Sequence, residues 1–347
     1  MEAAMRRALL VLNCAFVLVG GGAAPLLMRI YFTRGGSRVW FSTWLETAGF
    51  PVLLIPLTVI YFRHRSKQQT SEETFFMKPR LFMVSCIIGI LTGLDDFLDA
   101  NGAMRLPIST SALIGATQLA FTSCFAFLLV KQKFTSFSVN AVVLLTIGAA
   151  VLAMHTSSDR PEHESKGEYV LGFIMTVGAA TLYGFIMPFL ELNYMKAGQK
   201  ITYALVMQTQ IVICVFATGF STIGMIINND FKVIPREARE FELGEAKYYL
   251  VAVWTALGYQ MSFLGVIGIV FCASALLSGI MVSLLIPVTE VLGVIFLREK
   301  FQPEKGVSLA ISLWGFAFYF YGEFKALKKQ KLIEQTQTQT QEGSDHP

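Results

Sequence analysis

Three aspartates, Asp95, Asp96 and Asp99, follow the apolar run LFMVSCIIGILT in a strongly hydrophobic part of the chain. A carboxylate inside a membrane span is expensive, and it therefore indicates a functional site. Asp95 and Asp99 are four residues apart and share one helix face, and Asp96 lies three residues from Asp99. Carboxylates this close do not all ionise freely, so we expect one to be protonated at neutral pH or held by a cation.

Two other acids, Glu46 and Glu290, also lie within apolar runs. Together with Asp95 and Asp96 they are the candidates for carrying a coupled proton, because no histidine lies at the centre of a span. One alternative is that the third span ends at Gly93, which would make DDFLD a wet turn. For Glu46 and Glu290 the alternative is a structural hydrogen bond to a neighbouring helix.

Amide and aromatic side chains near the acids complete the expected ligand site. Amides can hydrogen-bond the edge of a heterocycle, although they can equally join helices. Aromatic faces stack on flat rings and attract cations, although most aromatics here serve packing or face lipid. The expected substrate-binding residues are Trp44, Glu46, Asp95, Asp96, Phe97, Asp99, Gln118, Phe121, Tyr183, Tyr259, Gln260 and Phe263.

The composition places these residues in a membrane. Of the 347 residues, 54% are hydrophobic and 15% are charged, with a mean hydropathy of +0.56. Soluble domains carry about 25% charged residues, and a large soluble helical protein is the weaker interpretation. The net charge of +4 is scattered between apolar runs, so nucleic-acid binding is not expected.

Apolar segments near the length of a membrane helix, about 20 residues, recur along the chain. Helices are expected, since the bilayer core cannot satisfy an open backbone. The distribution of Lys and Arg between the loops slightly favours a topology with both termini in the cytoplasm. The N-terminal apolar run resembles a signal peptide, but we interpret it as the first span. The ten expected spans are 8–30, 39–62, 81–104, 107–130, 137–155, 168–194, 201–227, 246–271, 273–297 and 304–322.

An internal repeat relates the two halves of the chain. KQKF at 131–134 returns as REKF at 298–301, and an earlier set, Pro25, Tyr31 and Gly35, returns as Pro188, Tyr194 and Gly198. Chance recurrence is the alternative for motifs this short. With five spans in each half, the second half must be inverted, which is typical of transporters with a midplane site. We expect repeats at 1–155 and 156–323, and a disordered cytoplasmic tail at 324–347.

Several motifs resemble the plant purine permeases of the drug/metabolite transporter superfamily. They are LPISTSALIGATQLAF, LVKQKFTSFSVNAVVLL, FCASALLSG, IPVTEVLGVIFLREKF and SLWGFAFYFYGE, and the similarity runs from about Leu10 to Glu323. The resemblance implies ten helices, cytoplasmic termini and proton-coupled uptake of purine bases, cytokinins or alkaloids. It also implies roles for Glu46, Asp95, Asp96, Gln118 and Glu290.

One departure from the family pattern concerns the ligand. The family usually has Tyr-Ala-Tyr where this chain has Asp-Ala-Asn at 99–101. A carboxylate in place of a stacking ring favours a protonated amine, such as an alkaloid, over a neutral purine.

Three functions other than proton-coupled import are less consistent with the sequence. An exchanger of phosphate sugars would need buried Lys or Arg, and a receptor or scaffold would not need inverted repeats. The sequence contains no HExxH or GxSxG motif that would indicate an enzyme. No cofactor or metal is expected. We expect a monomer in a lipid bilayer, most simply the plasma membrane, whose partners are a heterocyclic substrate and protons.

Overall fold

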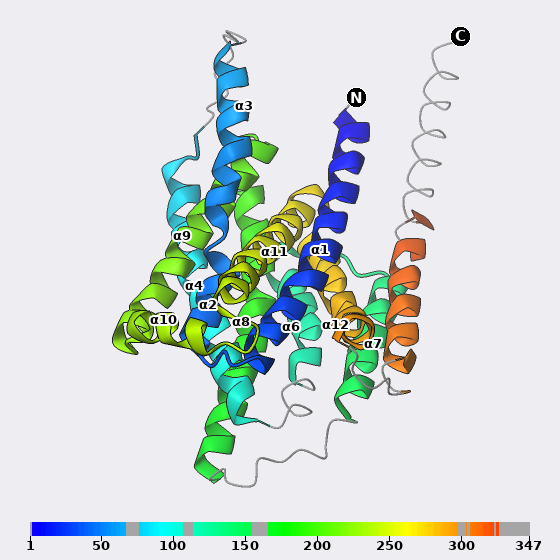
Figure 1. Ribbon diagram of the computed structural model, residues 1–347. Helices are drawn as coiled ribbons and strands as arrows, with labels where there is room; N and C mark the ends of the chain where they lie inside the picture. The colour runs from blue at the N-terminus through cyan, green and yellow to red at the C-terminus, as the bar shows by residue number, and fades with distance from the viewer. Residues whose placement is uncertain are drawn as a thin grey trace, which may run out of the picture.

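The computed structural model is helical throughout the part of the chain that it describes (Figure 1). The described residues are 2–66, 76–106, 114–154, 166–297, 303, 306–322 and 324–325. Most of the expected tail at 324–347 and the linker at 155–165 lie outside them.

The described part of the first half contains six α-helices, which Figure 1 labels, and two short helical segments, η1 and η2. They are α1 (Glu2–Thr33), α2 (Val39–Thr47), η1 (Phe50–Leu53), α3 (Leu54–Ser66), α4 (Pro79–Arg105), α6 (Gln118–Phe125), η2 (Ala126–Val130) and α7 (Ser136–Met154). The second half supplies α8 (Lys166–Met195), α9 (Tyr203–Ile227), α10 (Asp230–Glu240), α11 (Glu245–Cys272), α12 (Ala275–Leu297) and a helix over Gly306–Gly322.

Seven of the described helical stretches are long and apolar enough to cross a bilayer. Three shorter apolar helices, Ile114–Val130, Ser136–Val151 and Gly306–Gly322, accompany them. Large apolar side chains cover the outside of the bundle, including Val11 (69% exposed) and Ile55 (67% exposed). An exposed apolar surface of this extent fits lipid rather than water, and the protein is an integral multi-pass membrane protein.

The second expected span is a broken helix. α2 ends at Thr47, Gly49 precedes η1, Pro51 lies in the first turn of η1, and α3 resumes at Leu54. Proline supplies no backbone donor and disturbs a continuous α-helix. Gly49 also lies against α11, because a Cβ there would come within 2.4 Å of the Ala256 carbonyl oxygen. The break therefore lets the end of α2 approach α11 closely.

Small residues bring the long helices together. A Cβ on Gly20 of α1 would lie 2.5 Å from the carbonyl oxygen of Gly258 on α11, so only glycine fits there. Gly89 plays the same part between α4 and α9, where a Cβ would lie 2.4 Å from the carbonyl oxygen of Ile213. Membrane helices commonly pack through such small residues. These contacts fix α1 on α11 and α4 on α9 around the site described next.

Candidate functional site

Two adjoining cavities lie among α1, α2, α4, α6, α8, α11 and α12. The apolar chamber has a volume of about 290 Å³, and its characteristic wall residues are Ile186, Met187, Phe263, Val266, Leu285 and Ile286. The polar chamber has a volume of about 180 Å³, and its characteristic wall residues are Asp99, Gly115, Gln118, Thr176, Ala179 and Ala180. Four residues line both chambers and form their shared wall: Glu46, Asp95, Asp96 and Tyr183.

The three aspartates reach these chambers because α4 does not stop at Gly93. The helix begins with Pro79, whose missing donor is harmless in a first turn, and it continues to Arg105. The alternative of a wet turn after Gly93 is therefore wrong. Asp95 is 7% exposed, whereas Asp99, one turn later, is exposed on the wall of the polar chamber.

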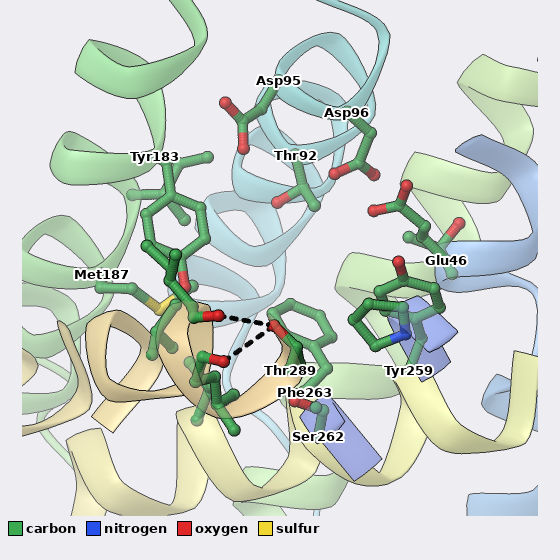
Figure 2. A pocket seen from close by; sticks show the side chains of 18 residues that line it. Glu46, Thr92, Asp95, Asp96, Tyr183, Met187, Tyr259, Ser262, Phe263 and Thr289 are labelled. Atoms are coloured by element: carbon green, nitrogen blue, oxygen red, sulfur yellow. Dashed lines mark hydrogen bonds between the residues drawn. The ribbon is translucent and has the colours of Figure 1, made fainter. Parts of the chain in front are cut away.

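The shared wall brings carboxylates from two helices together. Figure 2 shows the carboxyl groups of Glu46 on α2 and Asp96 on α4 pointing toward each other, and the two groups interact electrostatically. The hydroxyl of Tyr259 lies beside Glu46, and Tyr183 stands below Asp95 in the same view. Within the described residues, no three acidic, Cys or His side chains are placed to hold a metal ion. The arrangement places carboxyl groups from two helices at the wall of one cavity.

Two polar atoms on α4 have no partner among the described residues. They are the hydroxyl oxygen of Thr92 and Oδ2 of Asp96, and both are buried. Both Thr92 and Asp96 line the apolar chamber. Thr289, on the opposite side of the cavity, is satisfied instead by the carbonyl oxygens of Leu285 and Ile286 at 2.9 and 2.8 Å (Figure 2).

Pro25 adds a backbone acceptor to the apolar chamber. It lies inside α1, and both Pro25 and Gly21 line the chamber. An α-helix bonds each carbonyl to the amide four residues later, and proline has no such amide. The carbonyl of Gly21 therefore lacks its usual helical donor.

Of the residues expected from the sequence to bind substrate, eight line the chambers. They are Glu46, Asp95, Asp96, Asp99, Gln118, Tyr183, Tyr259 and Phe263. Glu290 lies within α12, but its side chain is outside the described residues.

The other four expected residues have partners elsewhere in the bundle. The indole of Trp44 donates to the hydroxyl of Thr222 at 3.1 Å, and Phe97 stacks on Trp40. Phe121 packs on the apolar cluster around Leu106. These contacts are the ordinary packing roles that aromatic residues fill in most helices.

Gln260 also lies between helices rather than on a cavity wall. It is fully buried on α11, where its amide nitrogen lies 3.7 Å from the sulfur of Cys214 on α9. Its backbone carbonyl accepts a hydrogen bond of 3.1 Å from Gln210, also on α9. Gln260 thus joins α9 to α11.

Sequence reasoning missed several wall residues that share a helix face with recognised ones. Thr92 lies three residues before Asp95, and Met187 lies four residues after Tyr183; both line the apolar chamber. Spacings of three and four place side chains on one face of a helix. That periodicity, applied outward from the acids and aromatics, was the signal that could have found them.

A multi-pass helical bundle with a buried acidic cavity defines a membrane transporter rather than an enzyme. A family model described as purine nucleobase transmembrane transport matches residues 8–329. Purine permease 3 of Arabidopsis thaliana is 53% identical over 98% of this chain and 97% of its own. Purine permease 2 of the same plant is 49% identical over 94% of this chain and 95% of its own. The chain belongs to the purine permease family.

The fold also occurs among solved structures. One crystal structure aligns with a TM-score of 0.57 over 88% of this chain and 97% of that chain, at 13% sequence identity. At this identity the match shows a shared fold and carries no information about the ligand.

Proposed function

We propose that the protein is a proton-coupled importer of small nitrogen heterocycles, namely purine bases, cytokinins or alkaloids. The observation that carries the proposal is the shared wall, where Glu46, Asp95 and Asp96 from two helices adjoin Tyr183 at one cavity. The family and its relatives named as purine permeases support purines as the substrate class.

The two chambers suit the two kinds of surface on such a ligand. A purine ring has flat apolar faces and an edge rich in hydrogen-bonding atoms. Tyr259 and Phe263 offer faces for stacking, while Thr92, the Gly21 carbonyl and the carboxylates offer polar partners. The apolar chamber, at about 290 Å³, lies near the lower end of the roughly 300–1,000 Å³ of small-molecule pockets.

A cytokinin adds a hydrocarbon substituent to the purine ring. With the ring edge at the shared wall, this substituent would extend over Met187, Leu285 and Ile286, which are apolar. Burial of hydrocarbon stabilises binding by about 0.8 kcal/mol per CH₂ group. The apolar chamber therefore supports cytokinins as well as bare bases.

The paired carboxylates support proton coupling. Two interacting acids bind their protons in steps that belong to the pair, so Glu46 and Asp96 can hold one proton between them. A proton taken from the outer side neutralises the wall and allows a neutral base to bind, and release of both then follows the conformational change. Asp95 and Glu290 stay candidates for the same proton.

Asp99 bears on the charge of the ligand. Asp99 is exposed and lines the polar chamber together with Gln118, but it is not part of the shared wall. An anionic group in that place would stabilise a protonated amine attached to a heterocycle. The same chamber would admit a neutral purine without using Asp99, so we propose that Asp99 extends the substrate range to cationic alkaloids.

We further propose the ten-span, inverted-repeat topology, with repeats at 1–155 and 156–323. The seven long and three shorter apolar helices support ten spans. In Figure 1, α1 descends from the end of the molecule marked N, whereas α8 rises toward that end, as an inverted second repeat requires. A monomer in the plasma membrane with both termini in the cytoplasm completes the proposal.

The competing transporter function has less support. A phosphate-sugar exchanger needs Arg or Lys at its site, and neither chamber has one on its wall in the ranges that the structure describes. A receptor or scaffold without transport would bind the ligand but would not exchange it across a bilayer. Counterflow of labelled adenine in liposomes distinguishes a transporter from a receptor or scaffold that only binds the ligand.

Uptake as a function of external pH tests the proposed function. Adenine and a tertiary-amine alkaloid would each be supplied from about pH 5 to about pH 8, with and without a protonophore, to cells that express the protein. We expect adenine uptake to rise as external pH falls, because a proton enters with the base, and to collapse with the protonophore. Adenine uptake that depends neither on external pH nor on the protonophore would exclude proton coupling.

A further inference from the structure

Glu237, on the short helix α10, is a buried acid outside the transport cavity. Its carboxylate is 7% exposed and accepts four hydrogen bonds. The hydroxyls of Tyr31 and Tyr248 donate at 2.7 and 3.0 Å, and the backbone and side chain of Ser37 donate at 3.1 and 2.9 Å. A carboxylate with this many donors is a built anchor rather than an incidental surface charge.

Arg38 and Asp230 extend the cluster around Glu237. The guanidinium of Arg38 lies 3.7 Å from Glu237 and 3.7 Å from Asp230, which is fully buried. The backbone amide of Arg38 donates to the hydroxyl of Tyr31 at 3.1 Å, and Asn228 donates to Asp230 at 2.8 Å. Every member therefore has at least one partner in the same cluster.

The donors come from the ends of three separate membrane helices. Tyr31 lies near the end of α1, Ser37 and Arg38 lead into α2, and Tyr248 lies in the first turn of α11. The start of α2 has no side-chain cap of its own. Glu237 accepts from the backbone amide and the hydroxyl of Ser37, which directly precedes the N-cap residue Arg38, and so ties the segment that leads into α2.

The anchored helices are those that carry two residues of the cavity. α2 carries Glu46, α11 carries Tyr259, and Figure 2 shows these two side chains side by side. We propose that Glu237 is a positioning residue for transport: it locks the start of α2 to α1 and α11, and so holds Glu46 against Tyr259. This inference rests on the proposed function, because it assumes that Glu46 belongs to the working site.

The expected effect follows from the population of the competent arrangement. If α2 is released, Glu46 occupies its place for a smaller fraction of the time. Apparent affinity falls in proportion to that fraction, while the chemistry of the site is untouched. Loss of Glu237 should therefore raise KM for adenine more than it lowers the maximal rate.

The test compares Glu237→Gln with Glu240→Gln on the same helix. Glutamine keeps the size of Glu237 but places an NH₂ group among donors. Glu240 is a matched control because its side chain is 65% exposed and its ion pair is with Arg236, four residues earlier, at 2.9 Å. Two measurements are made at equal amounts of folded protein: hydrogen exchange of the amides of 37–47 without substrate, and adenine uptake kinetics.

We expect Glu237→Gln to speed exchange across 37–47 and to raise KM by about five- to tenfold, with Glu240→Gln like the wild type. Unchanged exchange would overturn the anchoring role. Faster exchange with unchanged KM would overturn the positioning role and leave a purely structural one. If Glu237→Gln does not fold, Tyr248→Phe removes one donor and should shift both readouts in the same direction.

The hydrogen-exchange measurement does not depend on transport. Absence of adenine uptake by the wild type would therefore contradict the proposed function, while the exchange data would still decide whether Glu237 anchors α2.

Discussion

Trp40 of α2 lies flat against Phe97 of α4, with ring centroids 4.2 Å apart and ring planes 19° apart. Phe97 directly follows Asp96, and Trp40 lies six residues before Glu46. The stacked pair therefore joins the two helices whose carboxylates face each other across the shared wall. Phe97, a ring expected from the sequence to stack on the ligand, packs on Trp40 and lines neither chamber.

Removal of this stack should destabilise the protein. Trp40→Ala leaves a cavity between α2 and α4, and large-to-small core changes of this kind cost about 3–5 kcal/mol. We expect a lower melting temperature in detergent and weaker adenine uptake. Trp254→Ala is the control, because Trp254 is 57% exposed on the outside of α11. Equal melting of the two variants would contradict a structural role for the pair.

The two glutamines near the site should behave in opposite ways. Gln118 lines the polar chamber, so Gln118→Leu should weaken adenine binding with little change in melting. Gln260 contacts Cys214 between helices, so Gln260→Leu should change stability by about 0.5–1.5 kcal/mol and leave KM alone. Uptake kinetics and thermal melts of both variants check this. A KM effect for Gln260→Leu larger than that for Gln118→Leu would reverse the assignment.

The apolar chamber should distinguish ligands by their hydrocarbon. Ile286→Phe adds bulk where a cytokinin side chain would lie, while the ring edge at the shared wall is untouched. We expect uptake of N6-isopentenyladenine to fall by about tenfold or more relative to adenine, since small changes in an apolar pocket have effects of this size. Competition assays with both labelled ligands measure the ratio. An equal fall for both ligands would place the substituent elsewhere.

Asp99 should matter for charged ligands alone. At constant surface expression, Asp99→Asn should reduce uptake of a cationic tertiary-amine alkaloid by about tenfold or more, because it removes a charge-assisted contact. Adenine, which is neutral, should be taken up nearly as before. Alkaloid uptake that survives undiminished would remove Asp99 from the substrate site.

The sequence predicted much of the fold because apolar length and helix periodicity are local properties. It placed α4, α8, α9 and α11 within a few residues of their bounds. It did not show the break at Pro51 within the second span, because a membrane proline is tolerated in several ways.

The sequence located cavity-lining residues where one helix carries the signal, and it could not locate side chains whose direction is set by neighbouring helices. Polar residues within apolar runs are recognisable in the sequence, and three of them line the chambers: Asp95, Asp96 and Gln118. Trp44 has the same residue type as a ligand-stacking ring, but Thr222 on another helix fixes its direction. Glu237 gave no signal, because its donors come from α1, α2 and α11, which are distant in the sequence.

The movement of protons with the base tests the central claim most directly. Purified protein would be placed in liposomes that contain a pH-sensitive dye, and neutral adenine would be added outside without a pH gradient. The account predicts acidification of the interior as adenine enters, and loss of that signal when Glu46 and Asp96 are both neutralised to Gln and Asn. Entry of adenine at the normal rate with no change in internal pH would contradict it.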